Sequence, residues 1–226
     1  MARRIQNTPL QILCEGADDA EFFARLTQAR GLNRYHVECP KGKDDRPIGK
    51  GGFAKHLELI KQGIPSGAPL RGIVIITDSD EDPDASFREV QRSIRQSGLR
   101  VPDKPLDIMT NRSGFPATAV MMVPWHDRHG NLERVIFDAL IQMVPHLNPC
   151  LEAFRDCAGA QDRTESLQAK MLLRCLIAAL NPHDPSETLT NFLKAPIQYC
   201  PIDYNHAAFS QFWDFLTTFS DKLAEE

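Results

Sequence analysis

Residues 72–80 form the most informative segment of the chain, Gly72-Ile73-Val74-Ile75-Ile76-Thr77-Asp78-Ser79-Asp80. Its first six residues are mostly apolar and β-branched, which predicts a central strand buried on both faces. Strands of that kind belong to parallel sheets that carry helices on both sides. Two carboxylates, Asp78 and Asp80, come directly after them. The end of this strand is therefore the first place to look for a functional site.

On either side of this stretch, short apolar runs alternate with helical patterns over the first two thirds of the chain. Further strands are predicted at residues 10–14, 35–39 and 119–123, and helices at residues 17–30, 53–61, 84–97 and 131–143. This alternation predicts βαβ units around a mostly parallel sheet. We therefore expect an α/β domain over residues 8–145.

After residue 145 the pattern changes to helices only. The clearest are predicted at residues 164–180, 187–193 and 207–224. The last of these carries aromatic side chains at helical spacing, which predicts packing in a core or an interface. These side chains are Phe209, Phe212, Trp213, Phe215 and Phe219. We expect residues 146–226 to form a helical region packed on the α/β domain.

Composition excludes several classes of protein. The chain has 226 residues, 42% of them hydrophobic and 25% charged, which is ordinary for a globular protein and argues against disorder. Its net charge of -4 argues against capture of nucleic acid by the whole surface. No stretch is long and apolar enough to span a membrane, and the six cysteines include no C-x-x-C pair. We therefore expect a cytoplasmic protein with reduced thiols.

Three carboxylates stand just past the ends of two predicted strands. Glu15 follows the strand at residues 10–14, and Asp78 and Asp80 follow the strand at residues 72–77. Open α/β sheets place their sites at the carboxyl ends of adjacent strands, so these side chains are expected to meet. Clustered carboxylates repel one another unless a positive charge lies among them, and hard oxygen ligands suit Mg²⁺ or Mn²⁺. The pattern predicts a divalent metal site.

The two acidic segments resemble the motifs of the Toprim domain, which is shared by topoisomerases, bacterial primases, small ribonucleases and the overcoming-lysogenization-defect nucleases. Residues 10–16, Leu-Gln-Ile-Leu-Cys-Glu-Gly, are similar to its strand-Glu-Gly start. Residues 73–80 are similar to its hydrophobic strand that ends in Asp-x-Asp. Residues 124–133, which end in Gly-Asn-Leu-Glu, resemble the segment after the fourth strand in small stand-alone Toprim proteins.

This resemblance implies a Toprim-like sheet and a set of catalytic and metal-binding carboxylates. Glu15, Asp78 and Asp80 would hold the metal, and Glu15 would also act as a general acid or base. The candidates for a second metal ion are Asp19, Asp82 and Glu133. The implied activity is Mg²⁺- or Mn²⁺-dependent phosphodiester chemistry on DNA or RNA, in the manner of a Toprim-type nuclease.

Other uses of the same carboxylates stay open. An Asp-Ser-Asp turn after a strand is, taken alone, most often a helix cap or a solvated loop. A phospho-acceptor receiver domain also carries acids at strand ends, but the Glu15-Gly16 start and the missing lysine on a late strand count against it. The main alternative is a non-catalytic module that binds metal or nucleic acid in a larger assembly, with a protein partner or as a homo-oligomer.

Residues 40–52 form the one long predicted loop, which is rich in glycine and lysine. Its spacing departs from that of a P-loop, and it lacks the Ser or Thr that would bind Mg²⁺, which excludes that motif. Lys41, Lys43 and Lys50 are instead candidates for contacts to nucleic-acid phosphates, which need positive charge more than fixed geometry. A solvated basic loop is the alternative. Lys170, in the predicted helix at residues 164–180, is expected to be an ordinary solvated residue. The alternative is the role that a lysine has in some nuclease relatives, which is to neutralise charge in the transition state.

Overall fold

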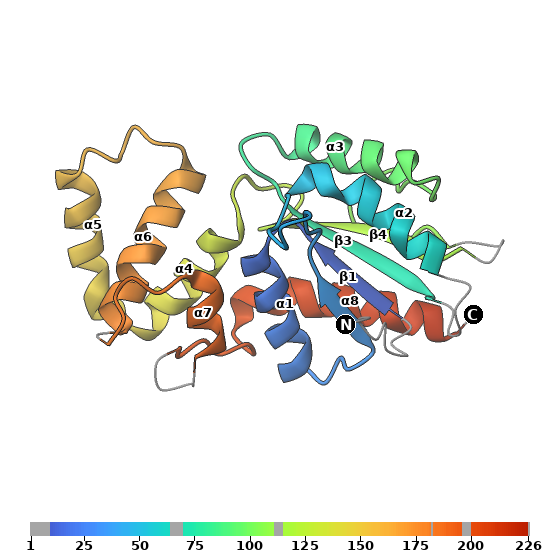
Figure 1. The fold of residues 1–226 in the computed structure, drawn as a ribbon. Helices are drawn as coiled ribbons and strands as arrows, with labels where there is room; N and C mark the ends of the chain where they lie inside the picture. The colour runs from blue at the N-terminus through green and yellow to red at the C-terminus, as the bar shows by residue number, and fades with distance from the viewer. Residues whose placement is uncertain (1–9, 64–69, 111–114, 182, 196–199, 226) are drawn as a thin grey trace.

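The computed structural model describes residues 10–63, 70–110, 115–181, 183–195 and 200–225. It confirms the predicted α/β class, since helices cover both faces of a four-stranded, all-parallel sheet (Figure 1). The outer ends of the predicted domains, residues 8 and 9 and residue 226, lie outside the described residues.

The sheet places the carboxyl ends of all four strands at one edge. Its strands are β1 (Leu10–Cys14), β2 (Tyr35–Glu38), β3 (Gly72–Asp78) and β4 (Ala117–Val123), in the spatial order β2-β1-β3-β4. The strand predicted at residues 119–123 begins earlier, because Ala117 pairs with Gly72 in the parallel register of β3 and β4. β1 and β3 are the two central strands, which explains why every residue of β1, and every residue of β3 except Asp78, is buried.

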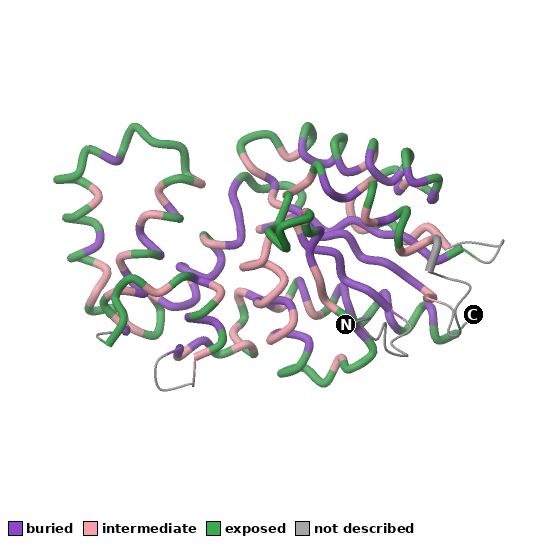
Figure 2. The backbone as a smooth tube through the Cα atoms, viewed as in Figure 1, coloured by how far each residue is buried: buried purple, intermediate pink, exposed green. Residues whose placement is uncertain are grey.

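Side chains from the strands alternate between two separate apolar layers, as the period of two in a strand requires. Leu13, Ile75 and Met122 pack with the residues of α2 (Phe53–Gly63) and α3 (Pro83–Gln96). On the opposite face, Ile12, Val74 and Met121 pack with α1 (Ala17–Ala29), α4 (Leu132–Met143) and α8 (Ser210–Ala224). Figure 2 shows the strands as a buried band between the two helical layers.

The C-terminal helix α8 runs along one face of the sheet (Figure 1). Its aromatic side chains pack in the core as predicted, with Phe212, Phe215 and Phe219 buried and Trp213 half-buried. Gly72 makes the close approach possible, because a Cβ there would lie 2.6 Å from both the Phe219 ring and the Leu223 side chain. The Tyr35 hydroxyl of β2 donates a hydrogen bond to the Leu216 carbonyl at 2.6 Å. The C-terminal helix α8 therefore completes the apolar core on one face of the sheet.

The remaining helices extend from the same core beyond the carboxyl edge of the sheet (Figure 1). They are α5 (Asn148–Cys157), α6 (Glu165–Leu180) and α7 (Leu189–Lys194), with short 3-10 turns at Lys50–Gly52, Pro145–Leu147 and Ala207–Phe209. α7 begins two residues later than predicted, because the Thr188 hydroxyl caps it by accepting from the Asn191 N–H at 3.3 Å.

Buried residues of α6 and α7, among them Leu173 and Phe192, belong to the same apolar core as α1 and α4. The division of the chain at residue 145 stays a prediction. Among the described residues, no helix is both long enough and apolar enough to cross a membrane.

Candidate functional site

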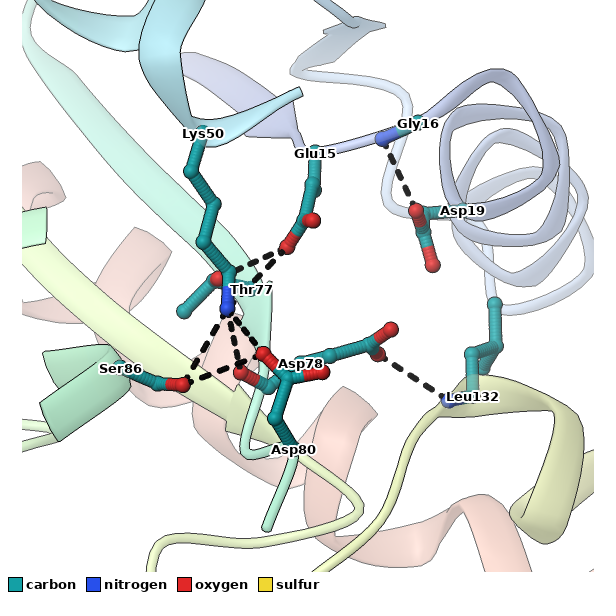
Figure 3. Close-up of polar contacts among 9 residues, drawn as sticks. All are labelled: Glu15, Gly16, Asp19, Lys50, Thr77, Asp78, Asp80, Ser86 and Leu132. Carbon is teal, nitrogen blue, oxygen red and sulfur yellow. Dashed lines mark hydrogen bonds and ion pairs between the residues drawn. The ribbon is translucent and has the colours of Figure 1, made fainter. Parts of the chain in front are cut away.

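The first carboxylate of the candidate site, Glu15, lies where β1 ends beside β3. The parallel register pairs Cys14 with Ile76, so the residues that follow them, Glu15 and Thr77, are neighbours. The Thr77 hydroxyl donates to Glu15 Oε2 at 3.0 Å (Figure 3). This bond holds Glu15 at the carboxyl edge of the sheet.

The second carboxylate, Asp19, comes from the first turn of α1. Its Oδ2 accepts from the Gly16 N–H at 2.9 Å, which satisfies one of the free amides at the start of the helix. Burial, followed by the charges of Glu133 and Glu15, raises the pKa of Asp19 to about 7, against the opposing effect of the Gly16 bond. The Asp19 carboxylate is therefore held among negative charges.

The third carboxylate, Asp78, is the last residue of β3 and lies at the N-terminus of α4. Its Oδ1 accepts from the Leu132 N–H, the first residue of α4, at 3.1 Å. A helix N-terminus favours an anion. Burial nevertheless raises the pKa of Asp78 well above its usual range, and the charges of Asp19 and Glu133 add to that effect.

The fourth carboxylate, Glu133, occupies the first turn of α4, and its side chain is 19% exposed. Burial raises its pKa, and the ammonium of Lys170, whose Nζ lies 3.8 Å from Glu133 Oε1, acts in the opposite direction. Glu133 is thus the one carboxylate of the four that has a cation from α6 beside it.

These four carboxylates share a cavity of about 470 Å³ at the carboxyl edge of the sheet. A fifth carboxylate, Asp18 of α1, also lines it and accepts a hydrogen bond from the Thr190 hydroxyl. The cavity is also lined by Lys170 and Arg174 of α6 and by Leu189 and Thr190 of α7. Lys170 and Arg174 are four residues apart, so they share one face of α6. The cavity therefore combines carboxylates that lie at the sheet edge with two cations from α6, Lys170 and Arg174.

A further lysine lies on the other side of Glu15. The Lys50 ammonium forms an ion pair with Asp80 and lies 3.7 Å from Glu15 Oε2 (Figure 3). It donates to the Asp78 backbone carbonyl at 3.4 Å and to the Ser86 hydroxyl at 3.2 Å. The Lys50 side chain is only 11% exposed. The acidic residues thus form two groups, one around the cavity and one around Lys50.

Two of the predicted metal ligands lie away from the cavity. Asp82 is exposed and caps α3, because its carboxylate accepts from the Ala85 N–H at 2.8 Å. Asp80 sits in a turn with a positive φ of 51° and is bound to Lys50. Neither residue lines the cavity. Their metal-binding roles stay predictions.

The lysines of the basic loop, residues 40–52, also differ in their distance from the cavity and in their partners. Lys50 is buried against carboxylates, whereas Lys41 pairs with Asp45 at 3.2 Å and Lys43 is exposed. Neither Lys41 nor Lys43 lines the cavity. Contacts of the three lysines with nucleic acid stay a prediction, and for Lys50 any such contact would start from a side chain that already has partners.

Sequence reasoning did not single out Arg174. It favoured a solvated role for Lys170, and it named Lys50 only as a candidate for contacts to phosphates. The i,i+4 spacing of Lys170 and Arg174 shows that they share a helix face, but it does not show which surface that face meets. Lys50 is flanked by glycines in a segment without periodicity, and its contact with Asp80 spans 30 residues. Local patterns carry no information on such a contact.

The donors around the cavity are carboxylate oxygens, which suit a hard divalent cation such as Mg²⁺ or Mn²⁺. Within the described ranges, no three His, Cys, Asp or Glu side chains are grouped closely enough to hold a metal ion as they stand. The oxygen donors around the cavity thus suit such an ion by their chemical type. Binding would require the carboxylates to turn toward one another.

Comparison with known proteins gives a family and no function. A family model described as "Protein of unknown function (DUF3226)" matches residues 9–221, which is nearly the whole chain. No curated protein and no solved structure matches the chain.

Proposed function

Because the chain belongs to the DUF3226 family, whose description assigns no function, we propose a function from the residues of the site: metal-dependent phosphodiester chemistry on nucleic acid. In this proposal the protein is a nuclease of the Toprim type that uses Mg²⁺ or Mn²⁺. The resemblance of residues 10–16 and 73–80 to Toprim motifs supports it. The cytoplasmic location expected from the cysteine pattern is part of the same proposal.

The observation that carries the proposal is the crowding of half-buried carboxylates around one cavity. Within the described part of the chain, neither Asp19 nor Asp78 forms an ion pair with a lysine or arginine, and the pKa of each is raised by burial and by neighbouring acids. Carboxylates in such a place cost free energy unless a cation joins them. A structural role alone does not account for five of them at one cavity, namely Glu15, Asp18, Asp19, Asp78 and Glu133.

A divalent cation, when bound, would supply positive charge to the phosphate oxygens of a substrate. The chain's own residues would do the rest. Lys170 and Arg174 line the cavity from α6 and are placed to bind substrate phosphates. Glu15, fixed by Thr77, is placed to accept or return a proton at its free carboxylate oxygen, Oε1, while Oε2 accepts from the Thr77 hydroxyl.

The proposal is tested by incubating the purified protein with labelled single- and double-stranded DNA and RNA in Mg²⁺, Mn²⁺ or EDTA. We expect cleavage of at least one substrate with metal and none with EDTA. Glu15→Gln and Asp78→Asn should each lower the rate by roughly a hundredfold or more. Asp214→Asn, at an exposed position of α8, is the control.

Cleavage that persists in EDTA, or that is unchanged in both site variants, would contradict the assignment. Metal-dependent binding of nucleic acid without cleavage would favour the alternative, a non-catalytic binding module within a larger assembly. The four substrates separate DNA from RNA, which the site chemistry does not distinguish.

A further inference from the structure

The Lys50 ammonium is surrounded by oxygen groups on several sides. It lies among Asp80, Glu15, the Asp78 carbonyl and the Ser86 hydroxyl, all oxygen groups (Figure 3). Negative or polar oxygens on several sides are also the surroundings of a hard metal ion. An ammonium there neutralises the same carboxylates without any metal.

The local backbone presents Lys50 to these oxygens and keeps it there. Gly49, with a positive φ of 64°, precedes the 3-10 turn Lys50–Gly52, which leads straight into α2. Gly52 is buried, and a Cβ there would lie only 2.5 Å from Ile48 and 2.6 Å from Pro40. The loop is therefore packed tightly beside Lys50.

The two groups of carboxylates differ in what neutralises them. Asp80 and Glu15 share Lys50, whereas Asp19 and Asp78 form no ion pair with a lysine or arginine of the described residues. The unneutralised charge lies on the cavity side, together with Glu133. A bound metal ion would stabilise the carboxylates on the cavity side most. It would stabilise Asp80 least, because Lys50 already neutralises that carboxylate.

We propose that Lys50 takes the place of a second metal ion, so that the site binds one divalent cation, on the cavity side of Glu15. Asp80 then acts by holding Lys50 and is not a ligand of the metal. This inference rests on the proposed function, since it assumes a metal site at the cavity.

The test is a count of bound Mn²⁺ ions, made by equilibrium dialysis and by the electron paramagnetic resonance spectrum of the full chain. Wild type should bind one ion and show an uncoupled, six-line signal. Lys50→Met should bind two ions and show the broadened spectrum of a coupled pair. Lys50→Arg keeps the charge and should bind one. The thermal midpoint of each metal-free variant checks that it is folded.

A second pair of variants leaves Lys50 in place, which keeps the test valid if Lys50→Met does not fold. Asp80→Asn should leave the affinity for Mn²⁺ within about threefold of wild type, whereas Asp19→Asn should weaken it roughly ten- to a hundredfold. Equal losses in both variants would overturn the inference.

The outcomes separate this inference from the proposed function. Two Mn²⁺ ions in wild type, or one in Lys50→Met, would overturn the role of Lys50 and leave a metal-dependent nuclease intact. No bound Mn²⁺ in either protein would overturn both.

Discussion

The carboxylate of Asp78 accepts a hydrogen bond from the backbone N–H of Leu132 at 3.1 Å, so the last residue of β3 meets the first residue of α4. This contact draws Glu133, the next residue of α4, to the cavity that Asp78 lines. One bond between strand and helix thus assembles two acids from segments more than 50 residues apart.

Asp78→Asn should raise the thermal stability of the metal-free protein and remove most of its response to metal. Asparagine keeps the acceptor for Leu132 but carries no charge in an acidic, buried place. Binding of Mn²⁺ at a hundredfold excess over Kd should stabilise wild type by about 2.7 kcal/mol, or about 5–11 °C in Tm. Melting curves with and without Mn²⁺ measure both effects, and the same metal response in both proteins would refute a metal site at Asp78.

The double variant Lys170→Met with Arg174→Met should bind nucleic acid more weakly and with less dependence on salt. Each lost phosphate contact lowers the slope of log affinity against log salt by about 1, so a decrease of about 2 is expected for duplex DNA. Fluorescence anisotropy over a series of salt concentrations measures it. Lys222→Met, exposed on α8, is the control and should keep the wild-type slope. An unchanged slope in the double variant would mean that α6 does not bind the backbone.

Gly72→Ala should destabilise the fold through contact between β3 and α8. The new methyl group would lie 2.6 Å from Phe219 and Leu223, in a core with no room to shift. Overpacking of this kind costs about 1–3 kcal/mol, or about 2–12 °C in Tm. Gly51→Ala is the matched control, since nothing lies within 4 Å of a Cβ there. Equal melting temperatures for the two variants would show that α8 does not pack as described.

Tyr35→Phe and Tyr204→Phe should affect the free energy of unfolding differently, although both remove one buried hydroxyl. Tyr35 donates to the Leu216 carbonyl at 2.6 Å, and its loss should cost about 1–3 kcal/mol. The Tyr204 hydroxyl is buried with no hydrogen-bond partner among the described residues, so its removal should be neutral or stabilising. Chemical denaturation measures both, and a larger loss for Tyr204→Phe would contradict these contacts.

Glu38→Gln should remove stability that depends on pH. Burial raises the Glu38 pKa, but hydrogen bonds and charges from His36 and His56 outweigh burial and hold the pKa well below its ordinary value of 4.5. A carboxyl whose pKa is lowered by folding stabilises the protein above its unfolded pKa, and that contribution is lost as pH falls.

The difference in unfolding free energy between wild type and Glu38→Gln should therefore shrink from about pH 5 to about pH 3, by at most about 1.4 kcal/mol per pH unit. Glu58→Gln, exposed on α2, should show no such trend. A difference that stays constant or grows toward low pH would mean that Glu38 is not held as an anion.

The strands and the acids at their ends could be predicted because both depend on local sequence. The unbroken apolar run of β3 reports burial on two faces, and the carboxylates that follow Cys14 and Thr77 lie at strand ends whatever the rest of the chain does. Parallel pairing then brings strand ends together at one edge, so the neighbourhood of Glu15 and Asp78 follows from fold class alone.

The boundaries of helices and strands were predicted less well where a helix cap or the register of strand pairing determines them. The start of α7 depends on the Thr188 hydroxyl, and the start of β4 depends on the pairing of Ala117 with Gly72. Each is an interaction of one or two atoms, which the periodicity of apolar residues does not report.

The parallel sheet and the acids at its edge follow from the sequence, because burial patterns and residue types are read along the chain. Which cations contact those acids depends on the tertiary structure. Lys50 follows a glycine turn and forms an ion pair with Asp80. Lys170 and Arg174 lie on α6 and line the cavity, whereas Asp82 caps α3. Charges interact across space and act over a few ångströms, so the path of the whole chain, and no local pattern, sets their partners.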